Sequence, residues 1–224
     1  MDKAAIHRII DSSQKHGWVF EPQAKEILRL ADLPVPEFSV VKTIEECEPA
    51  ADLLGYPLAA KVVSAEIIHK TELKGVVVNI DNLALLKQVF AGFAKLPGFL
   101  GVLLEGMSSG VELIVGSKVD HQFGPVVLLG IGGTGVEIYR DSVICMAPLT
   151  ADDVAQMIEG LKGRRLLEGY RGATPADLDS LIDTLIKFSL LSMELGNRFE
   201  SMDINPLFCS HHGCFVADAR IMLT

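Results

Sequence analysis

The sequence has no long apolar segment, which excludes a chain that crosses a membrane. Nowhere in its 224 residues do enough apolar side chains run together to span a bilayer, which takes about 20 of them in a helix. Residues 1–5 also lack the extended apolar core of a secretory signal. We therefore expect a cytoplasmic protein that does not bind membranes.

Positive charge is also scarce. Lys and Arg together number 20 against 29 Asp and Glu, which gives a formal net charge of -9 at pH 7. Such a chain repels a phosphate backbone unless it carries a strong basic patch. The densest basic cluster, residues 162–165, is typical of a solvated helix end. The charge balance argues against a nucleic-acid partner.

Cysteine is rare as well. Four cysteines in a chain of this length do not make a disulfide scaffold, so we expect reduced thiols. Cys209, His211, His212 and Cys214 lie close together, but their spacing matches no common zinc pattern. The two histidines suit the tip of a hairpin. We predict neither a disulfide framework nor a zinc site.

Helical and strand patterns alternate, which predicts an α+β protein with a substantial core. We expect a single module made of an N-terminal helix over 1–20, a first lobe over 21–104 and a second lobe over 105–224. The first lobe should hold strands around Val40, Lys61, Val77 and Val102. The second should hold strands over 111–115, 125–129 and 142–147, followed by a final hairpin.

Polar residues mark where several helices begin. We predict helices over 22–30, 44–54, 83–94, 151–160 and 175–196. Thr43, Thr150 and Thr174 would cap three of them, and Asp153 stands at capping-box spacing from Thr150. The apolar side of the N-terminal helix should dock against the body or against a partner.

Hard oxygen ligands gather near the C-terminus. A strand through Asp203 and Asn205, reversed at 210–213 and returned through 215–217, would set these side chains beside Asp218 on a hairpin. Mg²⁺ prefers such ligands and is usually coordinated by phosphates as well, so the segment indicates a nucleotide site. The plainer interpretation is a strand that ends at Asn205-Pro206, with Asp218 as a solvated edge residue.

A lysine interrupts an otherwise apolar strand. Lys61 lies in the run 58–63 and needs a counter-anion if it is buried. The loop that follows, 64–75, carries Lys70, hydroxyl groups and a glycine, which suit the binding of several phosphate oxygens. The alternative is that Lys61 reaches solvent from a strand end.

A short connection joins two further strands. Glu105, Gly106 and Met107 end the strand that begins at 101, and Glu112 lies in the next. A backbone hinge of this kind can offer an amide and a carbonyl to an adenine edge, while a carboxylate accepts from ribose hydroxyls. Taken alone, the segment is also typical of an ordinary hairpin.

Together these groups resemble one family. The matching stretches are 55–61, 68–72, 110–116, 123–133, 136–141, 147–149, 167–172 and 202–207, and they are spread over nearly the whole chain beyond about residue 20. The sequence is similar to ATP-grasp modules. More narrowly, it resembles the beta subunit of NDP-forming acyl-CoA synthetases, the ADP-forming acetate–CoA ligase group related to succinyl-CoA synthetase.

The resemblance implies an ATP-grasp fold, in which two α/β lobes bind a nucleotide between them. It implies an acid-thiol ligase that interconverts acyl-CoA, ADP and phosphate with carboxylate, CoA and ATP. His69 would carry phosphate between the nucleotide and a second phosphohistidine on a CoA-binding alpha subunit, so a hetero-oligomer is expected. By its residue type alone, a histidine in a polar loop is more often an ordinary polar residue than a nucleophile.

The expected ligands of the site follow. ATP or ADP would contact Lys61, Lys70, Glu105, Gly106, Met107 and Glu112, and Mg²⁺ would be held by Asn205, Asp218 and Asp203. Glu137 and Asp141 would assist the phosphohistidine or pair with Arg140 or Arg171. The glycine-rich segment 130–135 lacks the lysine of a P-loop, and we interpret it as a loop that lets two backbones approach closely.

Two departures from the family pattern concern charge near the phosphates. Cys145 stands where family members often carry an arginine, and Leu73-Lys74-Gly75 replaces a more glycine-rich loop end. Lys74 can restore the missing charge. Two other functions therefore stay open: an ATP-grasp carboxylate-amine ligase, which needs no histidine at position 69, and a non-catalytic nucleotide-sensing domain.

Overall fold

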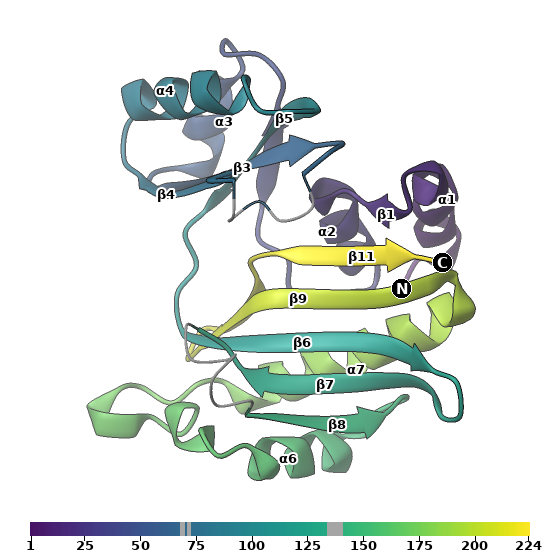
Figure 1. Cartoon of the computed structure of the whole chain (residues 1–224). Coiled ribbons are helices and arrows are strands. Elements are labelled where there is room, and N and C mark those ends of the chain that lie inside the picture. Colours follow the sequence, from purple (N-terminus) through teal and green to yellow (C-terminus); the bar gives the residue numbers. More distant parts are fainter. Residues whose placement is uncertain (68–69, 71–72, 134–140) are drawn as a thin grey trace. The chain divides into compact units, whose positions relative to one another are not determined.

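The computed structural model describes residues 1–67, 70, 73–133 and 141–224, and these form two compact units. Unit 1 comprises Met1–Val35 and Ser108–Thr224, and unit 2 comprises Pro36–Met107. Each unit combines an antiparallel sheet with helices (Figure 1). None of the helices in the described ranges has the length and apolarity needed to cross a bilayer.

Unit 1 is built on a seven-stranded sheet. The order is β1-β11-β9-β6-β7-β8, and β10 also pairs with β9. The strands are β1 (Trp18–Val19), β6 (Val111–Asp120), β7 (Gly124–Ile131), β8 (Ser142–Met146), β9 (Phe199–Ser210), β10 (Gly213–Val216) and β11 (Ala219–Leu223). Its helices are α1 (Lys3–Ser13), α2 (Glu21–Leu30), α6 (Ala151–Gly160) and α7 (Leu178–Leu195), with short 3-10 turns at Gln14–His16, Arg164–Leu166, Tyr170–Gly172 and Gly196–Arg198.

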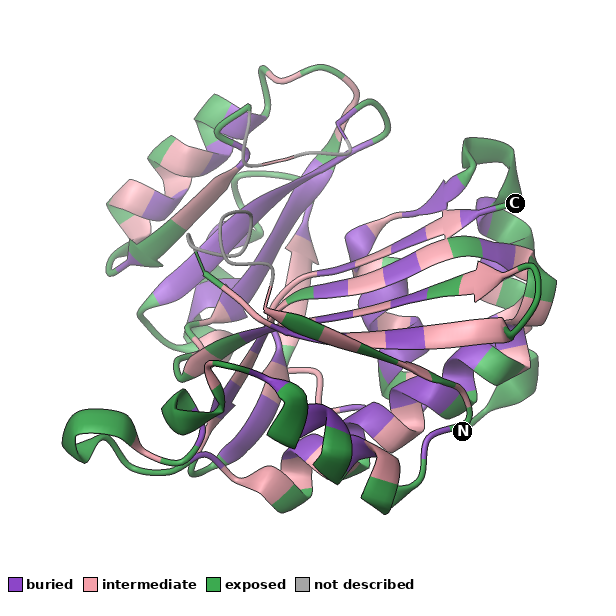
Figure 2. Cartoon of the chain, turned by 60° about the horizontal axis from the view of Figure 1, so that its bottom comes forward, coloured by how far each residue is buried: buried purple, intermediate pink, exposed green. Residues whose placement is uncertain are grey.

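The helices of unit 1 cover one face of this sheet. Buried and more exposed residues alternate along its strands (Figure 2), as expected when one face packs and the other does not. Leu113 and Val115 of β6 and Val127 of β7 point into the core formed with α2, α6 and α7. Ile144 and Met146 of β8 are more than half exposed on the opposite face, which we call the open face.

Unit 2 is smaller and has the same plan. Its four strands lie in the order β2-β5-β3-β4, with α3 and α4 packed against one face. The elements are β2 (Phe38–Val41), α3 (Cys47–Leu54), β3 (Leu58–Ser64), β4 (Val76–Ile80), α4 (Leu83–Phe93) and β5 (Phe99–Gly106). The strands expected around Val40, Lys61, Val77 and Val102 are all present.

Of the three predicted helix caps, the structure has one. The capping box of α6 is confirmed: Asp153 N donates to Thr150 Oγ1 at 3.2 Å, and Thr150 N donates to Asp153 Oδ2 at 2.8 Å. The other two predicted caps are wrong. Helix α7 is capped by Asp177, which accepts from Ser180 N at 3.0 Å, and not by Thr174. Helix α3 begins at Cys47, after a turn, so Thr43 does not cap it.

We expected the first lobe to begin at residue 21, but the smaller compact unit begins at Pro36. Helix α2 belongs to unit 1 because Ala24, Ile27 and Leu28 are buried in the core of that unit. Val216 N also donates to Pro34 O at 3.0 Å, so the chain stays on unit 1 until Val35. The first twenty residues form β1 as well as a helix, and β1 pairs with β11 at the edge of the larger sheet.

The N-terminal helix docks against the body of unit 1. Ile6 and Ile10 are fully buried, and polar contacts surround them. His7 Nε2 lies 2.9 Å from Glu194 Oε1, and His7 Nδ1 lies 2.7 Å from Arg198 Nη1. Hydrogen bonds from Lys3 and then from His7 hold the pKa of Glu194 below its ordinary value. Helix α1 is therefore fixed to the end of α7 by both apolar and charged contacts.

Our expectation of reduced thiols is wrong for one pair of cysteines. Cys209 of β9 and Cys214 of β10 are directly opposite one another, with Cα atoms 4.2 Å apart, and form a disulfide. Both are buried in the core of unit 1. Register explains the outcome, because the turn at 210–213 brings together two cysteines that are five positions apart.

Candidate functional site

Lys61 is buried and paired. Ala60 and Val62, its neighbours in β3, face the helices of unit 2, so Lys61 points to the other face of the sheet. Its Nζ lies 2.7 Å from Glu105 Oε1 on the adjacent strand β5. Lys61 is 5% exposed and Glu105 is 3% exposed. The interpretation of Lys61 as a side chain that reaches solvent is therefore wrong, and Glu105 is a counter-anion for it.

The connection after β5 leads from unit 2 to unit 1. Strand β5 ends at Gly106, and the amide of Met107 donates to Pro57 O at 3.4 Å. The Met107 amide thus already has an acceptor within unit 2. Gly110 follows at φ +144, where an added Cβ would lie 2.4 Å from Cys209 O. Only glycine lets the chain pass so close to β9.

The loop after β3 returns to the strand beside Lys61. Lys70 O accepts from Leu73 N at 3.2 Å and from Gly75 N at 2.7 Å, and Val62 N donates to Gly75 O at 2.8 Å. The turn from Lys70 to Gly75 is thereby attached to the residue next to Lys61. His69 lies outside the described residues.

The C-terminal hairpin brings Asn205 and Asp218 together, as predicted. Asn205 N donates to Asp218 O at 3.1 Å, and Ala217 N donates to Pro206 O at 3.0 Å. Strands β9 and β11 run side by side in Figure 1, with Ala219 opposite Ile204. One carboxylate and one amide oxygen thus share one end of the strand pair. The Asp218 carboxylate also accepts from Ala219 N at 2.8 Å.

Asp203 is held differently from the other two expected metal ligands. Arg220 of β11 lies opposite it and donates to both carboxylate oxygens, from Nε at 3.2 Å and from Nη2 at 3.0 Å. Over the residues that the structure describes, no three His, Cys, Asp or Glu side chains are grouped as metal ligands. The hairpin therefore offers Asn205 and Asp218 to a metal, while the Asp203 charge is balanced by Arg220.

A cavity of about 270 Å³ lies beside this ion pair on unit 1. Leu128 and Ile144 form an apolar wall, Asp203 and Arg220 line a charged wall, and Lys118 also lines the cavity. Gly116 lies opposite both Leu128 and Asp203 in the sheet and contributes no side chain. The cavity thus combines an apolar surface with charged groups of both signs.

The glycine segment 130–133 approaches β6 closely, as predicted. Gly132 N donates to Glu112 O at 2.7 Å, and an added Cβ at Gly132 would lie 2.9 Å from the backbone of Glu112. Glu112 itself is exposed. The segment therefore packs against the strand that carries Glu112. Glu137, expected just beyond it, lies outside the described residues.

Asp141 and Arg171 do not pair in the way we expected. The Asp141 carboxylate accepts from Lys162 N at 2.8 Å and from Gly163 N at 2.7 Å, so it fixes the backbone after α6. Arg171 is exposed, has φ +57, and lies over the ring of Tyr170 at 5.2 Å. Two backbone amides therefore satisfy the Asp141 carboxylate, while Arg140, the other partner we considered, lies outside the described residues.

Comparisons with known proteins decide the family. A model of the ATP-grasp domain matches residues 12–223. The chain belongs to the ATP-grasp family. It is 37% identical over 233 residues to the beta subunit of acetate–CoA ligase (ADP-forming) I from Pyrococcus furiosus, with 100% of both chains covered.

Solved structures agree with this assignment to the ATP-grasp family. The crystal structure of PH1788 from Pyrococcus horikoshii superposes with a TM-score of 0.93 at 35% identity and 99% coverage of both chains. A dinucleotide forming acetyl-coenzyme A synthetase 1 from Ca. Korarchaeum cryptofilum gives 0.86 at 31% identity, with 98% of this chain and 100% of that chain covered. That structure contains coenzyme A and Mg-AMPPCP, with a phosphohistidine segment pointing towards the nucleotide binding site.

The substitution at Cys145 affects a different part of this ATP-grasp chain than we expected. Cys145 lies opposite Val127, which is fully buried, and packs against the core on the helix-covered face of the sheet. The open face receives its neighbours Ile144 and Met146 instead. A side chain that leaves the strand at position 145 is therefore directed toward α6 and α7, away from the open face.

Sequence reasoning missed Arg220. Its only sequence signal is its place two residues after Asp218, which puts both on strand-like backbone near the hairpin. That Arg220 lies opposite Asp203 depends on the pairing register of β9 and β11, which spacing alone does not define.

We predict that breaking the Lys61–Glu105 pair strongly destabilises the protein. Glu105→Gln leaves a buried ammonium group short of a counter-charge, so the free energy of unfolding should fall by about 3 kcal/mol. The double variant Lys61→Met/Glu105→Leu should lose less stability than the single variants Lys61→Met and Glu105→Leu added together. Urea unfolding of these three variants measures this coupling.

Asp183→Asn is the matched control, because Asp183 lies 2.6 Å from Lys187 in an exposed pair. We expect this control to change the free energy of unfolding by less than about 0.5 kcal/mol. A loss for Glu105→Gln no larger than that of the control would contradict the role given to the buried pair.

Proposed function

We propose that the chain is the nucleotide-binding beta subunit of an ADP-forming acyl-CoA synthetase. The enzyme would interconvert acyl-CoA, ADP and phosphate with a carboxylate, CoA and ATP. The match that spans the full length of the Pyrococcus furiosus beta subunit carries this proposal. The buried Lys61 and the hairpin that joins Asn205 to Asp218 support it, because both are suited to a nucleotide with its metal.

Lys61 would neutralise charge on the nucleotide phosphates, and Glu105 would orient it. Phosphoryl transfer depends on alignment and charge neutralisation more than on covalent help from the protein. A lysine that is already desolvated and held at 2.7 Å from a carboxylate loses little freedom when it binds a phosphate oxygen. Lys70, Gly106, Met107 and Glu112 would complete the nucleotide contacts.

The residues of the hairpin fit a magnesium ion that comes with the nucleotide. Mg²⁺ is usually bound through one or two carboxylates, keeps several waters and takes its remaining ligands from phosphates. Asp218 and Asn205 supply one carboxylate and one amide oxygen at neighbouring backbone positions. When bound, the ion would neutralise charge on the phosphate oxygens.

His69 would receive the phosphoryl group. A bond forms between an imidazole nitrogen and the γ-phosphorus of ATP while the bond to the bridging oxygen breaks, and ADP leaves with that oxygen. This role rests on the sequence motif around His69-Lys70. Lys70 O accepts from Gly75 N, and Gly75 O accepts from Val62 N, so Lys70 is linked to the residue next to Lys61.

A CoA-binding alpha subunit would complete the enzyme in a hetero-oligomer. The relative from Pyrococcus furiosus is called a beta subunit, and the Korarchaeum structure contains a phosphohistidine segment that points towards the nucleotide binding site. The cavity beside Asp203 and Arg220 suits an incoming imidazole, because the Asp203 carboxylate can accept its N–H. The non-catalytic alternative rested on the loss of a cation near the phosphates at position 145. Because the Cys145 side chain packs toward the core, this substitution no longer supports that alternative.

We predict that Asp218→Asn weakens the binding of Mg-ATP by at least about tenfold and leaves the fold intact. A hard anionic ligand is replaced by a neutral one of similar shape, so the loss should appear only when magnesium is present. Calorimetric titration of ATP with and without Mg²⁺ measures it. Asp120→Asn is the control, since Asp120 lies on unit 1 at the end of β6, and its carboxylate accepts from Gln122 N in the following turn. A magnesium response equal to that of the unmodified protein would rule out the hairpin as the metal site.

We predict that the isolated chain binds Mg-ATP but makes no acyl-CoA. Addition of its CoA-binding subunit should restore both acyl-CoA formation and the synthesis of ATP from acyl-CoA, ADP and phosphate. Chromatographic separation of the CoA products measures both directions. A purified chain that forms acyl-CoA without a partner would contradict the proposal that nucleotide binding and CoA binding lie on separate subunits.

A further inference from the structure

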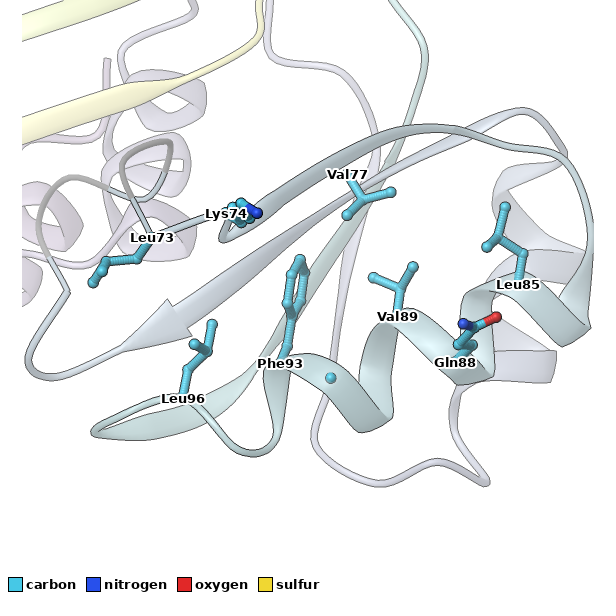
Figure 3. Close-up of a pocket in the computed structure, with 9 residues that line it drawn as sticks. Leu73, Lys74, Val77, Leu85, Gln88, Val89, Phe93 and Leu96 are labelled. Carbon is cyan, nitrogen blue, oxygen red and sulfur yellow. The ribbon is translucent and has the colours of Figure 1, made fainter.

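A groove in unit 2 has no part in the proposed reaction. It lies between α4 and the edge strand β4 and has a volume of about 350 Å³, which falls within the range of about 300–1,000 Å³ for small-molecule pockets. Its walls are apolar and include Val77, Val89, Phe93 and Leu96. Figure 3 shows Val77 of β4 and Val89 and Phe93 of α4 pointing into the same space. The groove can bury the apolar part of a ligand.

A glycine keeps this groove open. Gly92 lines it from within α4, although glycine in a helix is less stable than alanine. A Cβ built at Gly92 meets no atom within 4 Å, so close packing does not require glycine here. The missing side chain leaves space along the helix that a larger residue would fill.

Lys74 provides a cation at the rim. It lines the groove and has φ +54, a left-handed conformation uncommon for residues other than glycine. The turn in which Leu73 N and Gly75 N donate to Lys70 O fixes this backbone. Within the described ranges, Lys74 forms no ion pair. Its charge is therefore not balanced by an acidic side chain in the described part of the chain.

One cation beside apolar walls selects a particular class of ligand. A phosphate carries more charge and is usually bound by several charged or backbone donors, whereas the described lining of this groove supplies one cation, Lys74, and one neutral amide, Gln88. A carboxylate carries one charge and can be attached to an apolar tail. We propose that the groove binds a monocarboxylate with an aliphatic or aromatic tail, its carboxylate at Lys74 and its tail along Val77, Val89 and Phe93.

Such binding would act on the loop that carries His69. Leu73 and Lys74 belong to the turn that starts at Lys70, the residue after His69. A carboxylate held in the groove would restrain this turn and slow phosphorylation of His69. This consequence rests on the proposed function, whereas binding to the groove does not. Because a carboxylate is a substrate or product of the proposed reaction, the groove would let the acid inhibit the enzyme from a second site.

Calorimetric titration of the full chain without nucleotide tests the binding. We expect octanoate to bind about fivefold more tightly than 1-octanol, which has the same chain without the charge. Gly92→Leu should weaken octanoate binding by at least about tenfold by filling the groove. Ala91→Leu is the matched control, because Ala91 is the preceding residue of α4, is exposed and does not line the groove. It should bind octanoate like the unmodified protein.

A second pair of variants tests the charge. Lys74→Gln should make octanoate bind no better than 1-octanol, whereas Lys95→Gln, which changes an exposed lysine outside the groove, should have no effect. The proposal is overturned if the unmodified chain does not bind octanoate, or if Gly92→Leu binds it unchanged. If octanoate binds as expected but does not slow phosphorylation of His69, the groove stands as a carboxylate site and the link to the relay loop is wrong.

Discussion

The larger sheet depends on β9, because this one strand hydrogen-bonds to β6 on one side and to both β10 and β11 on the other. Its pairing with β11 sets Asp203 opposite Arg220 and Ala219 opposite Ile204, which places Asp218 beside Asn205. Alternate residues of β9, such as Met202 and Ile204, are buried under the helices. A shift of one residue would turn Asp203 and Asn205 into the core, so the core packing also fixes the polar groups of the site.

Unit 2 depends on a buried ion pair, because Lys61 lies away from water. A buried ammonium group is costly unless it is paired, and Glu105 meets that need from the adjacent strand. The pair then presents a fixed positive group whose orientation is set before any ligand arrives. The same unit carries the turn from Lys70 to Gly75, which is tied to the backbone next to Lys61. Backbone hydrogen bonds therefore link Lys70 and Gly75 to strand β3 next to Lys61.

Features that depend on nearby residues could be predicted from the sequence. The strand around Lys61, its need for a counter-anion and the capping box of Thr150 and Asp153 all follow from local patterns. Features that depend on register could not. Glu105 as the partner of Lys61, Arg220 as the partner of Asp203 and the Cys209–Cys214 disulfide each require knowing which residues face one another. The place of α2 in unit 1 likewise depends on long-range packing.

The central claim is that this ATP-grasp chain passes a phosphoryl group through His69. Incubation with Mg-ATP, or with the phosphorylated partner subunit, followed by intact-mass and phosphopeptide measurement at neutral pH, tests it most directly. The account predicts one acid-labile phosphate, located on His69 and absent from His69→Asn. An unlabelled His69 in a preparation that supports full acyl-CoA turnover with its partner would contradict the account.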